Sequence, residues 1–177
     1  MLVHLEEPKL AHADRFLQSV RRSRSLHRGL ASPPRTLEQY RAYLARVNQP
    51  THRGHLACLP DGAIAGVINI NEIVHGGFKS GYLGYYAFQP HNGQGHIAAG
   101  LQLVVARAFL AYRLHRLEAN IQPCNGRSIA LVRSFGFRLE GLSPRYLKIS
   151  GRWRDHERWA LTIEDWRQLP VSKRRAG

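Results

Sequence analysis

The segment that most constrains the fold is residues 89–105, QPHNGQGHIAAGLQLVV, where Pro, Asn and two glycines directly precede the longest helical pattern of the chain. Over residues 95–113 apolar side chains recur at helical spacing: Ile97, Leu101, Val104, Val105, Ala108 and Tyr112. The first N–H groups of a helix have no partner within the helix, and glycines allow an anion to approach the backbone closely. The segment is therefore either a turn or a phosphate-binding loop.

The hydrophobic period on both sides of this helix predicts further elements. Thr36 and Gln39 form a capping box that starts one of the helices, and short turns separate neighbouring strands. The predicted strands are residues 2–6, 55–59, 63–70, 81–88, 115–122, 145–150 and 152–163, and the other predicted helices are residues 8–20, 37–47 and 125–137.

This order of elements predicts one α/β domain with a central mixed, mostly antiparallel sheet of about seven strands and helices on both faces. The length of 177 residues fits a single domain. Its parts are an N-terminal strand and helices (1–50), a core (51–163) and a basic tail (164–177), the end of which is expected to be frayed. Strand–helix–strand crossovers are right-handed, so the fourth and fifth strands should be parallel and adjacent.

Composition restricts the partners. Lys and Arg outnumber Asp and Glu by 26 to 12, a formal charge of +14. This excess indicates either an anionic partner, such as RNA, the ribosome or a phosphorylated cofactor, or only a basic soluble surface. Cys58, Cys124 and ten scattered histidines show no metal-binding spacing, so no metal is expected. The absence of a long apolar stretch or a secretory signal pattern predicts a cytoplasmic protein without membrane association.

The succession of strand, GxG loop, long helix, strand and Asn-x-x-Ser helix resembles the GNAT acetyltransferase superfamily, in particular its RimJ/RimL-type ribosomal-protein N-acetyltransferases. The resemblance is close over residues 62–163 and looser over residues 1–60. It rests on GVINI, YLGY, GQGHI, HRLEANIQPCN, NGRS, SFGFRLEG and RWRDH. Residues 51–163 would then form the coenzyme-binding core of the domain.

The resemblance implies acetyl-CoA as the acetyl donor and an amine as the acceptor. The acceptor is either the N-terminal α-amino group of a ribosomal protein or a small amine, such as an amino acid, a polyamine or an antibiotic. The alternative class is a non-catalytic module that binds CoA or RNA. Whether the protein is a monomer or a homodimer is left open.

The resemblance also implies the residues that bind the coenzyme. Pro90 stands where the family usually has Gln or Arg and lacks an N–H group. A bulge near the end of the fourth strand would splay it from the fifth, leaving backbone groups of Ala87, Phe88 and Gln89 to pair with pantetheine. Asn125 would contact the coenzyme as well. The N–H groups expected around the pyrophosphate are those of Gly93, Gln94, Gly95, His96 and Ile97.

Amine acetylation requires removal of a proton from the acceptor and protonation of the leaving thiolate. The resemblance implies Ser128 of the Asn-x-x-Ser motif as the proton donor, and Asn125 with Ser128 also fits a helix N-cap. Cys124, near the expected thioester, is expected to be a buried structural thiol rather than a nucleophile.

The general base does not carry over, because Leu147 occupies the position of the glutamate proposed in RimL-type enzymes. The preferred candidate is Glu72, which follows the strand GVINI at the expected entrance for an acceptor. The others are Glu118 and Asp155, the latter expected to be partly buried on the strand face of Trp153 and Trp159. A water chain without a dedicated base is equally consistent with the sequence.

Overall fold

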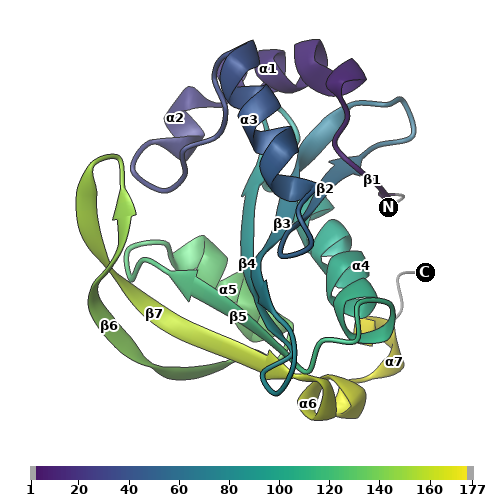
Figure 1. Ribbon diagram of the computed structural model, residues 1–177, viewed down its shortest axis with the longest axis vertical. Helices are drawn as coiled ribbons and strands as arrows, with labels where there is room; N and C mark the ends of the chain where they lie inside the picture. The colour runs from purple at the N-terminus through teal and green to yellow at the C-terminus, as the bar shows by residue number, and fades with distance from the viewer. Residues whose placement is uncertain (1–2, 175–177) are drawn as a thin grey trace.

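The computed structural model describes residues 3–174; residues 1–2 and 175–177 lie outside the described part, including the last residues of the predicted tail. Figure 1 shows a single sheet with helices packed around it. The strands are β1 (His4–Glu6), β2 (Arg53–Cys58), β3 (Ile64–Val74), β4 (Ser80–Ala87), β5 (Arg116–Ile121), β6 (Arg138–Ile149) and β7 (Arg152–Thr162). The helices are η1 (Leu10–His12), α1 (Ala13–Arg22), α2 (Arg24–His27), α3 (Leu37–Val47), α4 (His96–Leu110), α5 (Gly126–Ser134), α6 (Ile163–Gln168) and α7 (Val171–Arg174).

The seven strands form one sheet in the order β1-β2-β3-β4-β5-β7-β6. β4 and β5 are parallel and every other neighbouring pair is antiparallel. The predicted mixed sheet with its parallel fourth and fifth strands is therefore confirmed.

Two hydrophobic cores lie on opposite faces of this sheet. One core packs α1 and α3 against β2 and β3, with Phe16, Tyr40 and Phe88 among its buried side chains. The other packs α4 and α5 against β3, β4 and β5, with Leu101, Leu117 and Val132 buried. Adjacent residues of β4 enter different cores, since Tyr85 packs against the second while Tyr86 packs against the first. This alternation agrees with the period of two in the sequence.

The parallel strands diverge after a short paired stretch. β4 and β5 pair from Ser80 with Arg116 as far as Leu83 with Ala119. Beyond that point β4 stays paired with β3 and β5 stays paired with β7. The predicted splaying is thus present, and it opens the sheet at the ends of β4 and β5 that lead into the glycine loop and α5.

The bulge expected near the end of β4 is absent from its pairing with β3. The register runs without a shift to the pair of Gly66 and Ala87, and the shift lies between Asn71 and Val74 at the other end of β3. The expectation was wrong because an extra residue would turn the following β4 side chains to the opposite face. Phe88 is fully buried, so this displacement would remove it from its core.

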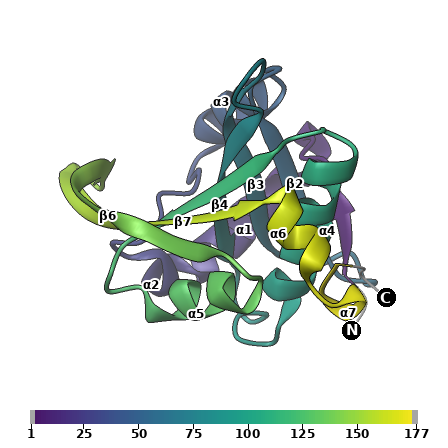
Figure 2. The ribbon, with the colours of Figure 1, turned by 90° about the horizontal axis from the view of Figure 1, so that it is seen from below.

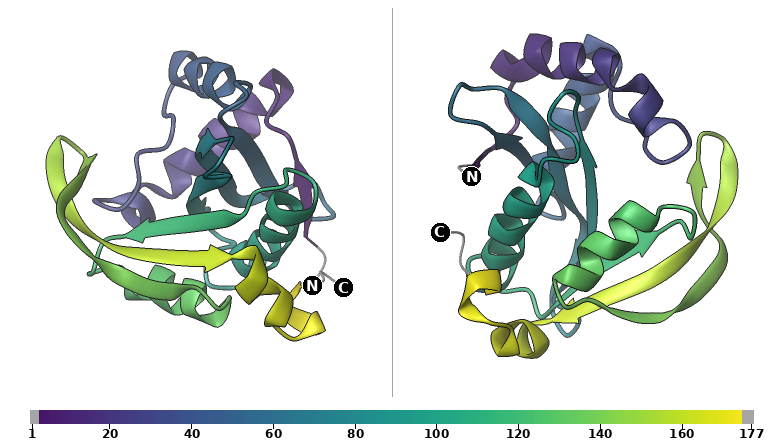
Figure 3. Two further views of the ribbon diagram at one scale, coloured as in Figure 1. Left: turned by 60° about the horizontal axis from the view of Figure 1, so that its bottom comes forward. Right: turned by 180° about the vertical axis from the view of Figure 1, so that it is seen from behind.

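The C-terminal part differs most from the sequence-based prediction. β6 begins at Arg138 rather than at residue 145, and two register shifts interrupt its pairing with β7. Because such irregularities break the alternation of side chains, the longer strand leaves little pattern in the sequence. The β6–β7 hairpin extends away from the rest of the molecule (Figure 2). Its loop reaches toward the segment that follows α2 (Figure 3).

Part of the predicted tail is helical. Thr162 is the N-cap residue of α6, and its hydroxyl accepts a hydrogen bond from the N–H of Asp165 at 3.4 Å. Trp166 is buried against Phe109, with ring centroids 5.4 Å apart. α7 covers Val171–Arg174, so this stretch is ordered where fraying was expected. In the described residues, every helix is too short or too polar to cross a bilayer.

Candidate active site

The glycine loop forms the start of α4. Gly93 and Gly95 have φ angles of +76° and +81°, which L side chains rarely adopt, and Gly95 is the N-cap residue. The first N–H groups of the helix have no intrahelical acceptor and point out of its N-terminus. A Cβ atom at Gly93 would meet no protein atom within 4 Å, so an anion has room beside this backbone. The loop therefore has the geometry of an anion site.

Two side chains brace this loop. Gln94 Nε2 donates to the carbonyl of Pro90 at 3.0 Å, and Gln94 Oε1 lies 3.3 Å from His96 Nε2. Since the amide oxygen can only accept, His96 donates from Nε2. Burial lowers the pKa of His96. A neutral His96 is also favoured by the positive end of the helix dipole.

The divergence of β4 and β5 leaves backbone groups of β4 directed away from β3. Phe88 donates its N–H to the carbonyl of Ala65 at 2.8 Å and thus faces β3. By the alternation of an antiparallel strand, the N–H groups of Tyr85 and Ala87 face the opposite side. β5 no longer pairs with β4 at this level, so these two N–H groups point into the opening.

Several of the backbone groups predicted to pair with pantetheine, those of Ala87, Phe88 and Gln89, already have hydrogen-bond partners in the protein. The carbonyl of Ala87 accepts from His27 Nε2 at 2.8 Å, and the N–H of Gln89 donates to Ser23 Oγ at 2.9 Å. Together with the bonded N–H of Phe88, this leaves the N–H of Ala87 as the donor best placed for a ligand. The contribution of the other groups stays a prediction.

Ser128 is held at the first turn of α5. Asn125 is the N-cap residue, and its Oδ1 accepts from the N–H of Ser128 at 3.3 Å. Ser128 Oγ donates to the hydroxyl of Tyr85, on β4, at 3.0 Å. Burial raises the pKa of Tyr85 to about 12, so this hydroxyl stays protonated at neutral pH. Tyr85 was not predictable as a site residue from the sequence, because a buried aromatic residue on a strand is normally a core residue.

One groove of about 680 Å³ connects the predicted catalytic residues. It runs along the opening between β4 and β5 and is bounded by the segment after α2 and by β6. Asn125, Ser128 and Glu72 all line it, whereas the glycine loop lies outside its lining. The groove lining also includes Arg46, His52, Asn69, Asn71, Tyr82, Tyr85, Asn120, Tyr146, Leu147 and His156.

Glu72 lies at the irregular end of β3. Its φ angle is +48°, an unusual value for a residue with a side chain, and 72% of its side chain is exposed. The carboxylate lies 3.5 Å from Nε2 of the buried His52, whose Nδ1 is 2.9 Å from Thr51 Oγ1. Among the groove-lining residues of the described chain, Glu72 is the one carboxylate.

The two other candidate bases have structural partners. Glu118 accepts from Arg116 at 2.9 Å and from Arg158 at 3.2 Å. Asp155 is exposed and accepts from the N–H of Arg145 at 2.7 Å, so its expected burial is wrong.

Asp155 is exposed because of the position of the β6–β7 hairpin. Trp159 is 3% exposed in the core, whereas Trp153 is 61% exposed further along β7. The covered strand face thus ends before Asp155. Cys124 is also exposed and lies outside the groove lining, which corrects its expected burial.

Comparison with known proteins assigns the class. Residues 3–138 match the family model described as an acetyltransferase (GNAT) domain. The chain therefore belongs to the GNAT acetyltransferase family.

Over 103 residues the chain is 40% identical to the ribosomal protein uS5 alanine N-acetyltransferase of Escherichia coli, covering 58% of this chain and 53% of that protein. The chain spans about half the length of the curated relatives it matches. Mycobacterium smegmatis RimJ in complex with CoA-disulfide superposes with a TM-score of 0.88 at 26% identity, covering 97% of this chain and 87% of that one. Vibrio cholerae spermidine N-acetyltransferase in complex with CoA and spermine has the same fold, with a TM-score of 0.80 at 16% identity over 94% and 98% of the two chains.

Proposed function

We propose that this protein transfers the acetyl group of acetyl-CoA to the N-terminal α-amino group of a ribosomal protein, by direct attack in a ternary complex. The observation that carries the proposal is the opening between β4 and β5, with Ser128 beside it and the glycine loop at the start of α4. The CoA complex of the structurally similar RimJ and the uS5-alanine relative support the donor and the acceptor.

The coenzyme would be bound mainly by backbone groups. The N–H groups from Gly93 to Ile97 would receive the pyrophosphate, where the helix dipole favours negative charge. The N–H of Ala87 would pair with pantetheine in the opening. The N–H of Tyr85 or Ala87 would stabilise the oxyanion that forms when the amine attacks the thioester. This division assigns coenzyme binding to α4 and the chemistry to β4 and α5.

Ser128 would act as the proton donor to the departing thiolate. For this step the hydrogen bond between the two hydroxyls would reverse, with Ser128 donating to the sulfur and Tyr85 donating to Ser128 Oγ. As the Ser128 proton moves to sulfur, Tyr85 would pass its proton to Ser128 Oγ, and water in the groove would then restore Tyr85. The raised pKa of Tyr85 ensures that this proton is present at neutral pH. The hydrogen bond between the two hydroxyls supplies the path for it.

Glu72 would accept the proton of the acceptor ammonium, directly or through water. Its carboxylate lines the groove and is open to solvent, so the proton can leave after each turnover. His52 would hold the carboxylate in place from its buried side.

The charge of the groove favours a peptide N-terminus over a polyamine. Polycations are bound best where several carboxylates converge, whereas this groove combines Glu72 with Arg46 and neutral polar groups. One ammonium group on an otherwise neutral peptide matches this lining. The formal charge of +14 would also favour work close to ribosomal RNA in the cytoplasm.

The test combines binding and turnover. Acetyl-CoA is titrated by calorimetry, and thiol release is then followed with ribosomal-protein N-terminal peptides, spermidine and free amino acids. Release with a peptide, but not with the same peptide carrying a blocked N-terminus, supports the proposal. Release with spermidine or an amino acid alone assigns a small-amine acceptor. Binding without any release contradicts the proposed transfer, and absence of binding contradicts the coenzyme site.

A further inference from the structure

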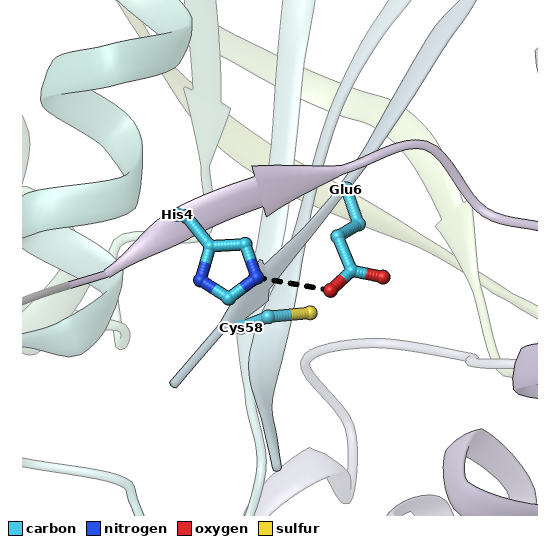
Figure 4. Close-up of side chains that lie close together, drawn as sticks. All are labelled: His4, Glu6 and Cys58. Atoms are coloured by element: carbon cyan, nitrogen blue, oxygen red, sulfur yellow. Dashed lines mark hydrogen bonds and ion pairs between the residues drawn. The ribbon is translucent and has the colours of Figure 1, made fainter. Parts of the chain in front are cut away.

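A second cluster of reactive side chains lies at the β1 edge of the sheet. His4 and Cys58 are direct cross-strand partners of β1 and β2, and Glu6 follows two residues after His4 on the same strand face. Figure 4 shows the three side chains converging. The imidazole nitrogen, the carboxylate oxygen and the thiol sulfur all lie within 4.8 Å of one another.

Glu6 is distinguished by a thiol beside its histidine partners. Within the described residues, its ion pairs are with His4 at 2.9 Å and with His12 at 3.2 Å. Glu118 and Glu140 pair with arginine, whereas Glu72 and Glu164, like Glu6, pair with histidine. In a chain with 26 Lys and Arg residues, this carboxylate instead contacts imidazole and thiol groups, which are metal ligands.

We propose that His4, Glu6 and Cys58 form a zinc-binding site, with water as the fourth ligand. Nitrogen, oxygen and sulfur from these residue types are the ligands that Zn²⁺ prefers in tetrahedral sites. A carboxylate and a thiolate together balance the charge of the ion. No metal was expected from the sequence, because the ligands come from residues up to 54 positions apart rather than from a local motif.

The geometry needs only a small adjustment to accept the ion. Zinc–ligand distances of about 2.0–2.3 Å place tetrahedral ligand atoms roughly 3.5 Å apart. Cys58 is fully buried and fixed by strand pairing, whereas the His4 side chain is 53% exposed and contacts Glu6 at 2.9 Å, so its ring could exchange this contact for an ion. His4 can therefore close the site around an ion held by Cys58 and Glu6.

The neighbouring groups fit this assignment. His12 Nδ1 accepts from the N–H of Lys9 at 3.1 Å, so neutral His12 carries its proton on Nε2 and donates it to Glu6. His12 thus orients the carboxylate instead of binding the ion, as partners of metal ligands commonly do. Zinc binding would release the proton of the Cys58 thiol, because the thiolate is the form that binds the metal.

Cobalt is a suitable spectroscopic probe, because a thiolate bound to Co²⁺ gives a charge-transfer absorption in the near ultraviolet. The full chain is reduced, titrated with Co²⁺ and then with Zn²⁺. We expect one equivalent to produce the absorption and Zn²⁺ to abolish it. Cys58→Ala should remove the absorption, and the matched variant Cys124→Ala should retain it.

His4→Ala and Glu6→Gln should each weaken Co²⁺ binding at least tenfold. These variants decide the question if Cys58→Ala does not fold, because both side chains lie at the surface side of the cluster. The proposal is overturned if the unmodified chain gives no thiolate absorption, if Cys124→Ala loses it, or if His4→Ala and Glu6→Gln bind Co²⁺ as tightly as the unmodified chain. None of these outcomes depends on acetyl transfer.

Discussion

The hydroxyl of Ser128 donates a hydrogen bond to the hydroxyl of Tyr85 at 3.0 Å and thereby joins the first turn of α5 to β4. The two residues are 43 positions apart, and both line the groove. Asn125 fixes the backbone of Ser128 from the other side. The serine is therefore positioned by contacts with both a strand and a helix cap.

Tyr85→Phe keeps the buried ring and removes only the hydroxyl. If Tyr85 returns the proton to Ser128, we expect kcat to fall about 10- to 100-fold while the Kd for acetyl-CoA changes little. Ser128→Ala should lower kcat by a similar factor, and the double variant should cost less than the product of the two effects. Steady-state kinetics and calorimetry test this. Ser134→Ala, at the other end of α5, is the control; full activity of Tyr85→Phe would remove Tyr85 from the proton path.

Gly95→Glu should abolish tight coenzyme binding. The φ angle of +81° is strained for any side chain, and the added carboxylate would repel the pyrophosphate. We expect the Kd for acetyl-CoA to rise at least 100-fold in a calorimetric titration. Gly76→Glu is the matched control, because Gly76 has a φ of +70° in the turn between β3 and β4. Equal affinity in the two variants would mean that the loop is only a turn.

Glu72→Gln should alter the pH dependence of turnover. Without the carboxylate, the acceptor ammonium must lose its proton to water, so we expect kcat/KM to fall about 100-fold near pH 7 and to recover as the pH rises toward the pKa of the amine. The measurement is a pH–rate profile with the best peptide acceptor. Asp155→Asn removes an exposed carboxylate of β7 and serves as the comparison. Superimposable profiles for Glu72→Gln and the unmodified protein would favour a water chain without a dedicated base.

His55 makes the fold sensitive to acid. It is 1% exposed and donates from Nδ1 to the carbonyl of Ile68, and its Nε2 lies 3.1 Å from the hydroxyl of Tyr112. Its pKa is lowered to about 4, mainly by burial. Between pH 6.5 and 4 the unfolded chain binds a proton at this residue and the folded chain does not. The free energy of unfolding should therefore decrease as the pH falls through this window, by about 2 kcal/mol between pH 7.5 and pH 5 from His55 alone.

Urea unfolding at several pH values, with His55→Asn for comparison, measures this contribution. We expect the variant to be less stable at pH 7.5 and to lose less stability on acidification. Burial also lowers the pKa values of His12, His27 and His96, which act in the same direction but remain in the variant. Parallel pH dependences for the two proteins would rule out His55 as a source of acid sensitivity.

The features that local chemistry determines were predictable from the sequence. The Thr36 cap, the glycines before α4 and the cap at Asn125 occur where the pattern placed them. The parallel pairing of β4 and β5 followed from the handedness of the crossover and needed no further information.

Features that depend on distant segments were not predictable in the same way. The contact of Tyr85 with Ser128 and the convergence of His4 with Cys58 require the register of several strands. The exposure of Asp155 depends on how far the β6–β7 hairpin extends beyond the core, which strand alternation does not encode. The base candidate Glu72 lies at a register shift, where a strand pattern gives no direction for the side chain.

The early divergence of β4 and β5 also has a consequence for hydrogen exchange. The N–H groups of Tyr85 and Ala87 belong to a central strand, yet at their level β5 does not pair with β4. They should exchange with deuterium quickly in the free protein, like amides at the edge of a sheet. Exchange should become slow once the pantetheine of the coenzyme fills the opening between β4 and β5. Two backbone amides could thus report coenzyme occupancy without any label or acceptor.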